Sequence, residues 1–302
     1  MKRNTIHTGD ATETLQELPS ESVNMVMTSP PYWNLRDYDH DDQLGLEETS
    51  EAYVRNLADV FDKVKRVLRD DGSLWLNLGD TYDDKDLQQI PARVALELQN
   101  RGWILRNRVT WAKPNPMPQS VKDRLNDTTE AVFHFVKSKE YWYDLDAIRE
   151  PHAEGTVRNA KKDGYEPFNH EKAKENKQRG DRNDGGQQVE YSDKVDLAAG
   201  KNPGDVFEVT TKPFPDAHFA VYPPELCEKP IKATCPPDGV VLDPFAGAGT
   251  TLLKAKELGR EYVGIELNPE YADMARARIG LSPHDPSNVR DDDNQSGLEA
   301  YD

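Results

Sequence analysis

Short apolar runs alternate with helical periodicities along most of this chain. The runs at 23–28 and 240–242 are nearly continuous apolar segments, which is typical of strands buried on both faces. Over 50–68 and 250–258, apolar residues instead recur at helical spacing. Strands that alternate with helices form parallel sheets with helices on both faces. The chain is therefore predicted to adopt an α/β fold around a mostly parallel sheet.

The remaining segments follow the same two patterns. Further strands are predicted at 73–78, 103–111, 131–136, 206–209 and 262–265. Further helices are predicted at 90–98, 224–234 and 269–279. Asp71-Gly72 is expected to end the helix that begins at 50, because glycine commonly follows a helix C-terminus.

The composition excludes several classes of protein. Hydrophobic residues make up 36% of the 302 residues, enough to bury a core without covalent staples. No apolar stretch approaches the roughly 18–20 residues of a membrane helix, and the first residues lack the apolar region of a secretory signal. Cys227 and Cys235 are too few for a disulfide framework or a four-ligand zinc site. We expect a soluble cytoplasmic protein with no metal site and no membrane partner.

Charge is distributed unevenly. Lys and Arg number 38 against 55 Asp and Glu, a net charge of −17 that by itself argues against a polyanionic partner. Basic residues nevertheless gather at 101–124 and 158–182, and acidic residues at 37–51 and 291–293. The basic segments predict either faces that bind nucleic acid or an ordinary solvated surface. An acidic body is also typical of halophilic proteins.

Residues 151–202 differ in composition from their surroundings. They are mostly Lys, Glu, Asp, Asn, Gln and Gly with isolated apolar residues, so they bury little surface by themselves. We expect a long insertion that is mobile until it meets a partner. It separates residues 1–150 from 203–280, and an acidic flexible tail follows at 281–302.

A strand, a glycine turn and a helix start follow one another at 240–251. Gly247 and Gly249 allow a ligand to approach the backbone, and the helix start offers free N–H groups. The turn lacks the Gly-Lys-Ser/Thr of a phosphate loop, and Asp243 suits a positively charged ligand better than a phosphate. Glu266 ends the next strand, where an acid holds a ribose diol. This pattern predicts a site for S-adenosyl-L-methionine; the simpler alternative is a structural turn and a surface glutamate.

Ser29-Pro30-Pro31-Tyr32 directly follows the strand at 23–28. Its two prolines restrict the backbone, so the Ser29 hydroxyl and the Pro30 carbonyl are expected to be fixed acceptors for an exocyclic amine. The Tyr32 ring beside them can stack on a base flipped out of a nucleic acid. Taken alone, the same residues are compatible with a polyproline-like turn.

Together these motifs resemble those of the β-class DNA amino-methyltransferases, which methylate an exocyclic nitrogen of cytosine or adenine. The family carries Ser/Asp/Asn-Pro-Pro-Tyr before Asp-Pro-Phe-Xaa-Gly-Xaa-Gly-Thr, as this chain does at 29–32 and 243–250. Segments 72–80, 111–125 and 218–231 are similar to further parts of the family. The resemblance covers most of 8–277 except the insertion.

The resemblance implies a Rossmann-like fold of the S-adenosylmethionine-dependent methyltransferases. We expect a mostly parallel seven-stranded sheet with an antiparallel hairpin, circularly permuted so that the catalytic half precedes the cofactor half. Residues 151–202 take the place of the target-recognition region.

The same resemblance assigns roles to individual residues. Expected catalytic residues are Ser29, Pro30, Pro31 and Tyr32. Expected cofactor-binding residues are Asp10, His218, Phe219, Asp243, Pro244, Phe245, Gly247, Gly249, Thr250 and Glu266. Expected DNA-binding residues are Trp33, as a second wall for the base, with Lys113, Lys122 and Arg124.

The first residue of the catalytic motif bears on the target base. Ser29 favours cytosine-N4, since adenine-N6 enzymes of the family usually carry Asp or Asn there. Adenine-N6 methylation is the alternative, followed by methylation of structured RNA and by a non-catalytic DNA-binding protein with this fold. Cytosine-C5 chemistry needs a cysteine nucleophile that follows a proline. Cys227 follows Leu226 and Cys235 follows Thr234, so neither fits this chemistry.

The expected reaction is direct transfer of the sulfonium methyl group to the amine of a flipped base. Accepting both N–H bonds at Ser29 and Pro30 stabilises the positive charge that grows on nitrogen. Neither a covalent intermediate nor a metal is required. Double-stranded DNA is the expected partner, with a cognate restriction endonuclease as a second candidate and a monomer or weak homodimer as the assembly.

Overall fold

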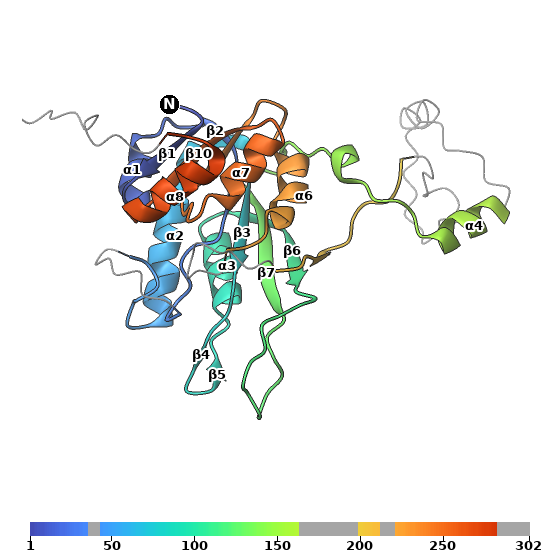
Figure 1. The fold of residues 1–302 in the computed structure, drawn as a ribbon, viewed down its shortest axis with the longest axis horizontal. Coiled ribbons are helices and arrows are strands. Elements are labelled where there is room, and N and C mark those ends of the chain that lie inside the picture. The colour runs from blue at the N-terminus through green and yellow to red at the C-terminus, as the bar shows by residue number, and fades with distance from the viewer. Residues whose placement is uncertain (36–42, 163–198, 212–220, 283–302) are drawn as a thin grey trace, which may run out of the picture.

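The computed structural model describes residues 1–35, 43–162, 199–211 and 221–282. Within them, eight strands form one sheet in the order β1-β10-β9-β2-β3-β7-β6-β8 (Figure 1). In that order the strands are Thr5–Thr8, Glu261–Glu266, Val240–Asp243, Val23–Thr28, Leu68–Leu78, Thr129–Val136, Ile104–Ala112 and Val206–Glu208. Neighbours run parallel except where β7 pairs with β3 and with β6.

The predicted Rossmann-like fold class is confirmed, with one strand more than the seven expected. The additional strand is β8, which lies on the outer edge of β6 and pairs Val206 with Thr110. The antiparallel hairpin is formed by β6 and β7, which pair Val109 with Val132.

The catalytic and cofactor halves meet at the centre of the sheet. There β2 lies beside β9 in parallel, with Met25 opposite Val241 and Val26 opposite Leu242. Because the strands are parallel, the segments that follow them emerge at the same edge of the sheet. Residues 29–32 and 244–250 are thereby brought together despite their distance in sequence.

Helices cover both faces of the sheet. One face carries α1 (Ala11–Glu17), α2 (Ser50–Val67) and α3 (Ile90–Asn100), and the other carries α6 (Pro224–Thr234), α7 (Thr250–Glu257) and α8 (Pro269–Ile279) (Figure 1). Successive residues of a strand point to opposite faces. Accordingly, Val26 and Leu74 pack with the first group of helices, whereas Met25 and Trp75 pack with the second.

The helix predicted to end at Asp71-Gly72 ends earlier, at Val67. The next residue, Leu68, is fully buried and begins β3. Gly72 lies inside that strand, where a Cβ would lie 2.9 Å from the Asn24 carbonyl oxygen. This glycine therefore serves the close approach of two strands, which is a second common role of glycine in sheets.

Four further elements complete the described chain. The strands β4 (Tyr82–Asp83) and β5 (Asp86–Leu87) form a small hairpin, and Asp146–Ile148 forms one turn of 3-10 helix. The helix α4 (Glu154–Lys162) belongs to the segment expected to be a long insertion that is mobile until it meets a partner, and Figure 1 shows it away from the sheet. Residues 163–198 of that insertion lie outside the described residues. No described helix is long and apolar enough to cross a membrane.

Candidate active site

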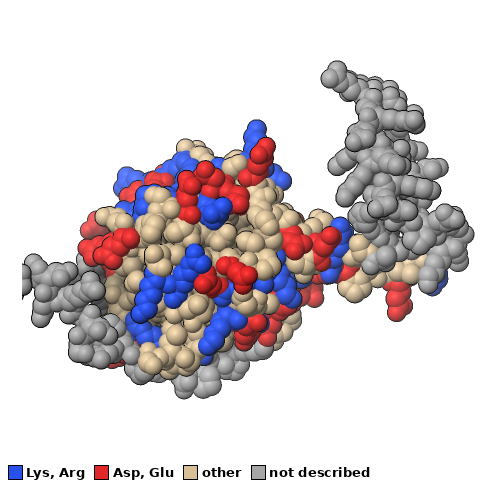
Figure 2. Space-filling view, turned by 90° about the horizontal axis from the view of Figure 1, so that it is seen from above, with Lys and Arg blue, Asp and Glu red and all other residues tan. Residues whose placement is uncertain are grey.

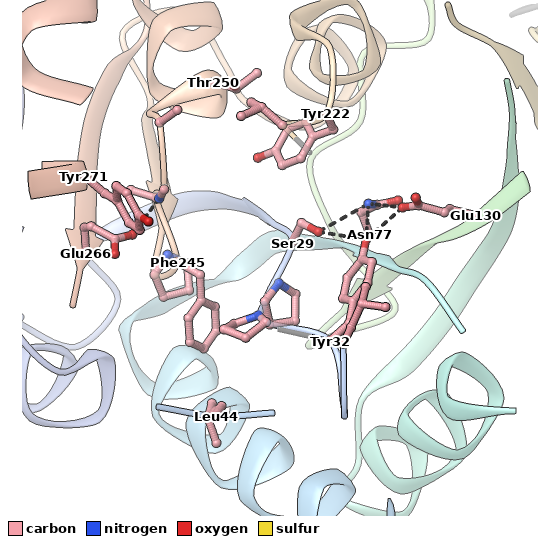
Figure 3. Close-up of a pocket in the computed structure, with 18 of the residues that line it drawn as sticks. Ser29, Tyr32, Leu44, Asn77, Glu130, Tyr222, Phe245, Thr250, Glu266 and Tyr271 are labelled. Carbon is pink, nitrogen blue, oxygen red and sulfur yellow. Dashed lines mark hydrogen bonds between the residues drawn. The ribbon is translucent and has the colours of Figure 1, made fainter. Parts of the chain in front are cut away.

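A cavity of about 1310 Å³ lies where the central parallel strands end. Residues that follow β2, β9 and β10 contribute to its wall, together with Asn77 near the end of β3. Crevices at the carboxyl ends of parallel strands are the usual ligand sites of such sheets. Figure 3 shows Glu266, Tyr271 and Phe245 toward one end of this cavity, and Ser29, Asn77 and Glu130 toward the other.

At the first end, Glu266 organises the glycine turn. Its carboxylate accepts hydrogen bonds from the Gly247 N–H at 2.7 Å and from the Asn268 N–H at 3.0 Å. Burial raises the pKa of Glu266 above its ordinary value. Each carboxylate oxygen has a second lone pair, so Glu266 can still accept hydrogen bonds from a ligand in the cavity.

The glycine turn leaves room for a ligand beside Gly247. Its φ of 50° lies in the left-handed region, and a Cβ there would meet no atom within 4 Å. Gly249, with a φ of 74°, serves packing instead, since its Cβ would lie 3.0 Å from the Cβ of Ala275. The open space at Gly247 lies in the same cavity as the Phe245 ring and the Glu266 carboxylate, which can accept hydrogen bonds from a ribose. This combination fits an adenosyl ligand.

Asp243 does not face the cavity, contrary to its expected role as a direct ligand. It is fully buried and accepts hydrogen bonds from the Thr28 hydroxyl at 2.6 Å and the Phe245 N–H at 3.1 Å. The Tyr222 hydroxyl donates a third, at 3.3 Å. Burial raises the pKa of Asp243 to about 6. Asp243 therefore joins the ends of β2 and β9 and fixes the start of the turn.

At the other end of the cavity, four side chains form one hydrogen-bond network. The Tyr32 hydroxyl donates to Glu130 Oε2 at 2.7 Å and lies 3.0 Å from Ser29 Oγ. The Asn77 amide donates to Ser29 Oγ at 3.3 Å, to Tyr32 Oη at 2.9 Å and to Glu130 Oε2 at 2.8 Å. The dashed lines in Figure 3 follow part of this network. Lys113 forms an ion pair with the second oxygen of Glu130.

Burial and the neighbouring Glu130 carboxylate raise the pKa of Tyr32 well above its ordinary value, so its phenol remains protonated. The ring is packed tightly. A Cβ on Gly79, just after β3, would lie 2.5 Å from Tyr32 Cε2. Below the motif, the Tyr53 hydroxyl of α2 donates to the Pro31 carbonyl at 2.8 Å and fixes the backbone of the loop.

Trp33 does not take the expected place as a second wall for a base. It is 6% exposed, packs in the core, and donates its indole N–H to the Glu47 carbonyl at 2.9 Å. An aromatic residue that follows a catalytic motif is as suitable for the core as for a binding surface, and here the fold uses it for the core.

The basic stretch at 101–124 does not form one face. Arg101 pairs with Asp59 at 2.6 Å and Asp62 at 2.7 Å. Arg124 instead lies in the loop between β6 and β7, bonded to Asp127 at 2.8 Å, with its guanidinium 4.0 Å from the centre of the Tyr82 ring. On the face shown in Figure 2, Lys and Arg lie among Asp and Glu rather than in one patch.

The structure thus brings most of the predicted site residues to one cavity. The cavity is lined by Asp10, Ser29, Pro30, Pro31, Tyr32, Lys113, Pro244, Phe245, Gly247, Thr250 and Glu266. Predicted residues that are described but do not line it are Trp33, Lys122, Arg124, Asp243 and Gly249. His218 and Phe219 lie outside the described residues.

Asn77 and Glu130 line the cavity but were not predicted as site residues. Asn77 is in the segment 72–80, which the family resemblance covered without giving this residue a role. Glu130 carries no local signal, since it is a single acid beside a predicted strand. The pairing of β3 with β7 places Leu78 opposite Ala131 and so brings Glu130 next to the catalytic motif.

Comparisons with known proteins agree with this geometry. A model of the N6/N4 DNA methylase family matches residues 23–277. The type II methyltransferase M.XycI of Xanthomonas campestris pv. cyanopsidis is 39% identical over 92% of this chain and 88% of its own length. M.SmaI of Serratia marcescens is 38% identical over 90% of this chain and 89% of its own.

Solved structures share the fold. The cytosine-N4-specific PvuII DNA methyltransferase superposes with a TM-score of 0.67 at 21% identity, covering 94% of this chain and 89% of its own. A Thermus thermophilus protein in complex with S-adenosyl-L-methionine has a TM-score of 0.57 at 26% identity, covering 91% of this chain and 94% of its own.

Proposed function

The chain belongs to the N6/N4 DNA methylase family and uses S-adenosyl-L-methionine, and on this premise we propose that it methylates the N4 amine of cytosine at specific sites in double-stranded DNA. One observation carries the proposal. The Ser29 hydroxyl, an acceptor for an exocyclic amine, lines the same cavity as Gly247 and Glu266. An amine held at Ser29 therefore shares a cavity with the cofactor site.

The cofactor end of the cavity is suited to the nucleoside part of S-adenosyl-L-methionine. Glu266 would accept from the ribose hydroxyls, the Phe245 ring and Gly247 would contact the adenosyl group, and Asp10 lines the same cavity. When bound, the cofactor supplies an electrophilic methyl group on its sulfonium sulfur. Asp243 contributes by holding the Phe245 N–H and so the turn.

The catalytic end supplies acceptors for the amine. Ser29 Oγ and the carbonyl of Pro30 would accept its two N–H bonds and stabilise the positive charge that develops on nitrogen. Tyr53 holds the next carbonyl, that of Pro31, so the loop is rigid before the base arrives. A serine in the first position of the motif favours cytosine over adenine within the family.

Two projecting elements supply a surface for DNA beside the cavity. In Figure 1 the β4–β5 hairpin and the loop between β6 and β7 extend from the same end of the sheet. They are joined by Arg124 stacked on Tyr82 and by the Lys85–Asp123 ion pair at 2.7 Å. We infer that this surface contacts the duplex around the flipped base.

We assign target recognition to residues 151–202, which contain many Asn, Gln, Lys and Arg side chains able to contact base edges. Deleting 161–182 is expected to abolish site-specific methylation and to leave the affinity for S-adenosyl-L-methionine unchanged. Methylation of the same sites at the same rate by the deletion variant would place recognition elsewhere, in the segment 115–124.

Product analysis tests the target base. DNA methylated with isotope-labelled S-adenosyl-L-methionine is digested to nucleosides, which are identified by mass. N4-methylcytosine supports the proposal, and N6-methyladenine contradicts it. Ser29→Ala is the matched control: it should retain cofactor affinity by calorimetry and lose roughly 10²–10³-fold in turnover, the cost of removing one preorganised charge-stabilising contact.

A further inference from the structure

Glu130 lies at the end of a chain of hydroxyl groups that begins at the predicted acceptor for the amine. Ser29 Oγ lies 3.0 Å from Tyr32 Oη, and Tyr32 donates to Glu130 Oε2 at 2.7 Å. The carboxylate also pairs with Lys113, and Asn77 donates to it at 2.8 Å. Nothing in the local sequence marks Glu130 as part of the site.

The carboxylate fixes the direction of this chain. An ionised carboxylate only accepts hydrogen bonds, so the single Tyr32 hydroxyl hydrogen points to Glu130. The Ser29 hydroxyl must then donate to Tyr32, and the remaining lone pair of Ser29 faces the cavity. Asn77 supports the same direction, because its amide NH2 group shares its two hydrogens among all three oxygens as a donor. Ser29 is thereby held as an acceptor, as an incoming amine requires.

Methyl transfer also releases a proton that must leave the amine. We propose, on the basis of the function proposed above, that Glu130 receives this proton through the hydroxyls of Ser29 and Tyr32. The bond from the methyl carbon to sulfur breaks as the bond to the amine nitrogen forms. One N–H proton passes to Ser29 Oγ, the Ser29 proton to Tyr32 Oη, and the Tyr32 proton to Glu130 Oε2.

This sequence leaves a neutral methylamino base, a neutral thioether and a protonated Glu130, so charge and protons balance. Tyr32 never needs to ionise, because it gains one proton as it loses another. Its raised pKa, caused by burial and by Glu130, is consistent with this role. Glu130 faces the cavity and can return its proton to solvent after the product leaves. It is a positioning residue and proton acceptor that acts through Tyr32.

The titratable groups around Glu130 come from two elements. Lys113 follows β6, and Tyr32 follows β2; Asn77 of β3 completes the surroundings and does not titrate. These contacts hold Glu130 Oε2 beside the Tyr32 hydroxyl, in the position where it can receive the proton.

Two variants interrupt the chain at different points. Glu130→Gln keeps the size of the side chain but removes the proton acceptor. Tyr32→Phe keeps the ring against Gly79 and removes the link between Ser29 and Glu130. Each is expected to slow the single-turnover rate by about 10²-fold or more, the usual contribution of a positioned acid or base. Because both act in one chain, the double variant should be no slower than the slower single variant.

Readouts beyond rate separate this role from a structural one. Calorimetric affinity for S-adenosyl-L-methionine should be unchanged in both variants. With isotope-labelled glutamate, infrared difference spectra of the wild-type protein should show a protonated carboxyl after turnover. Glu51→Gln, at a surface glutamate paired with Arg93 at 2.6 Å, is the matched control and should keep the wild-type rate.

A Glu130→Gln protein with the wild-type single-turnover rate would overturn the relay. So would effects of the two substitutions that multiply in the double variant, since independent roles would then explain them. Failure of the relay is distinct from failure of the proposed function: the wild-type protein would still form N4-methylcytosine in the first case and would not in the second.

Discussion

The hydroxyl of Thr28 donates a 2.6 Å hydrogen bond to the carboxylate of Asp243 in the centre of the molecule. These are the last residues of β2 and β9, so one buried bond joins the strand that carries the catalytic motif to the strand that carries the glycine turn. The two halves are 215 residues apart in sequence at this point. The geometry of both ends of the cavity depends on this junction.

The first prediction concerns the pH dependence of stability at that junction. Burial raises the pKa of Asp243 from 3.8 to about 6, so the unfolded chain releases this proton at lower pH than the folded protein does. The contribution of Asp243 is therefore fully present below the unfolded value and is lost as the pH rises through about 6. Its size is on the order of 3 kcal/mol.

Urea unfolding of the wild-type protein and Asp243→Asn, from acidic to neutral pH, measures this contribution. The amide of the variant cannot ionise, so its free energy of unfolding lacks this loss. As the pH rises, the free energy of unfolding of the variant should therefore increase relative to that of the wild type. Two profiles that stay parallel over this range would show that Asp243 has the same pKa in the folded and the unfolded protein.

The sequence predicted the bounds of a helix correctly where residues at its own ends determine where it starts and stops. The bounds of α6 and α8 were predicted at 224–234 and 269–279, where the structure has them, because proline begins each helix and Gly280 ends the second. The predicted end of α2, at Asp71-Gly72, was wrong. Gly72 does not end the helix but allows β3 to approach the Asn24 carbonyl closely. That contact depends on the tertiary fold.

The same division applies to the cavity. Ser29 and Gly247 belong to short motifs whose spacing marks a turn after a strand, so sequence alone could identify them. The pair of Glu130 and Lys113 depends on the antiparallel register of β6 and β7, which places Trp111 opposite Glu130. Register is set by packing across the whole sheet, so no local pattern predicts this pair.

The second prediction concerns Glu266. Replacing it with glutamine removes a charged acceptor from the Gly247 N–H and from the expected ribose contact. Hydrogen bonds to charged groups contribute about 1.5–3 kcal/mol, so the dissociation constant for S-adenosyl-L-methionine should rise by roughly 10- to 100-fold. Calorimetric titration measures it. Glu261→Gln, at the start of the same strand and paired with Arg3, is the control and should bind normally.

The third prediction concerns the space beside Tyr32. In Gly79→Ala the new methyl group would lie 2.5 Å from Tyr32 Cε2, so the ring must shift from the position in which its hydroxyl contacts Ser29 and Glu130. Methyl transfer should fall by an order of magnitude or more, because a small misplacement of a reacting group is costly. Cofactor affinity should not change, since Gly79 lies against Tyr32, and Figure 3 shows Tyr32 well away from Glu266.

Gly204→Ala is the matched control for this substitution, because a Cβ at Gly204 would meet no atom within 4 Å. Its turnover should equal that of the wild-type protein. If Gly79→Ala also keeps the wild-type turnover, the position of the Tyr32 ring does not limit the reaction.

The last prediction concerns Lys122, an exposed residue in the loop between β6 and β7. Its role as a phosphate contact is supported by its position beside Arg124 on the surface assigned to the duplex. Lys122→Ala should weaken binding to all DNA sequences alike and should lower the slope of log affinity against log salt by about 0.9, the value for one phosphate contact. Lys139→Ala, an exposed lysine just beyond the far end of β7, should leave affinity and slope unchanged. Fluorescence anisotropy with a cognate and a non-cognate duplex over a range of salt concentrations measures both quantities. A loss confined to the cognate duplex would instead assign Lys122 to base recognition, because phosphate contacts carry no sequence information.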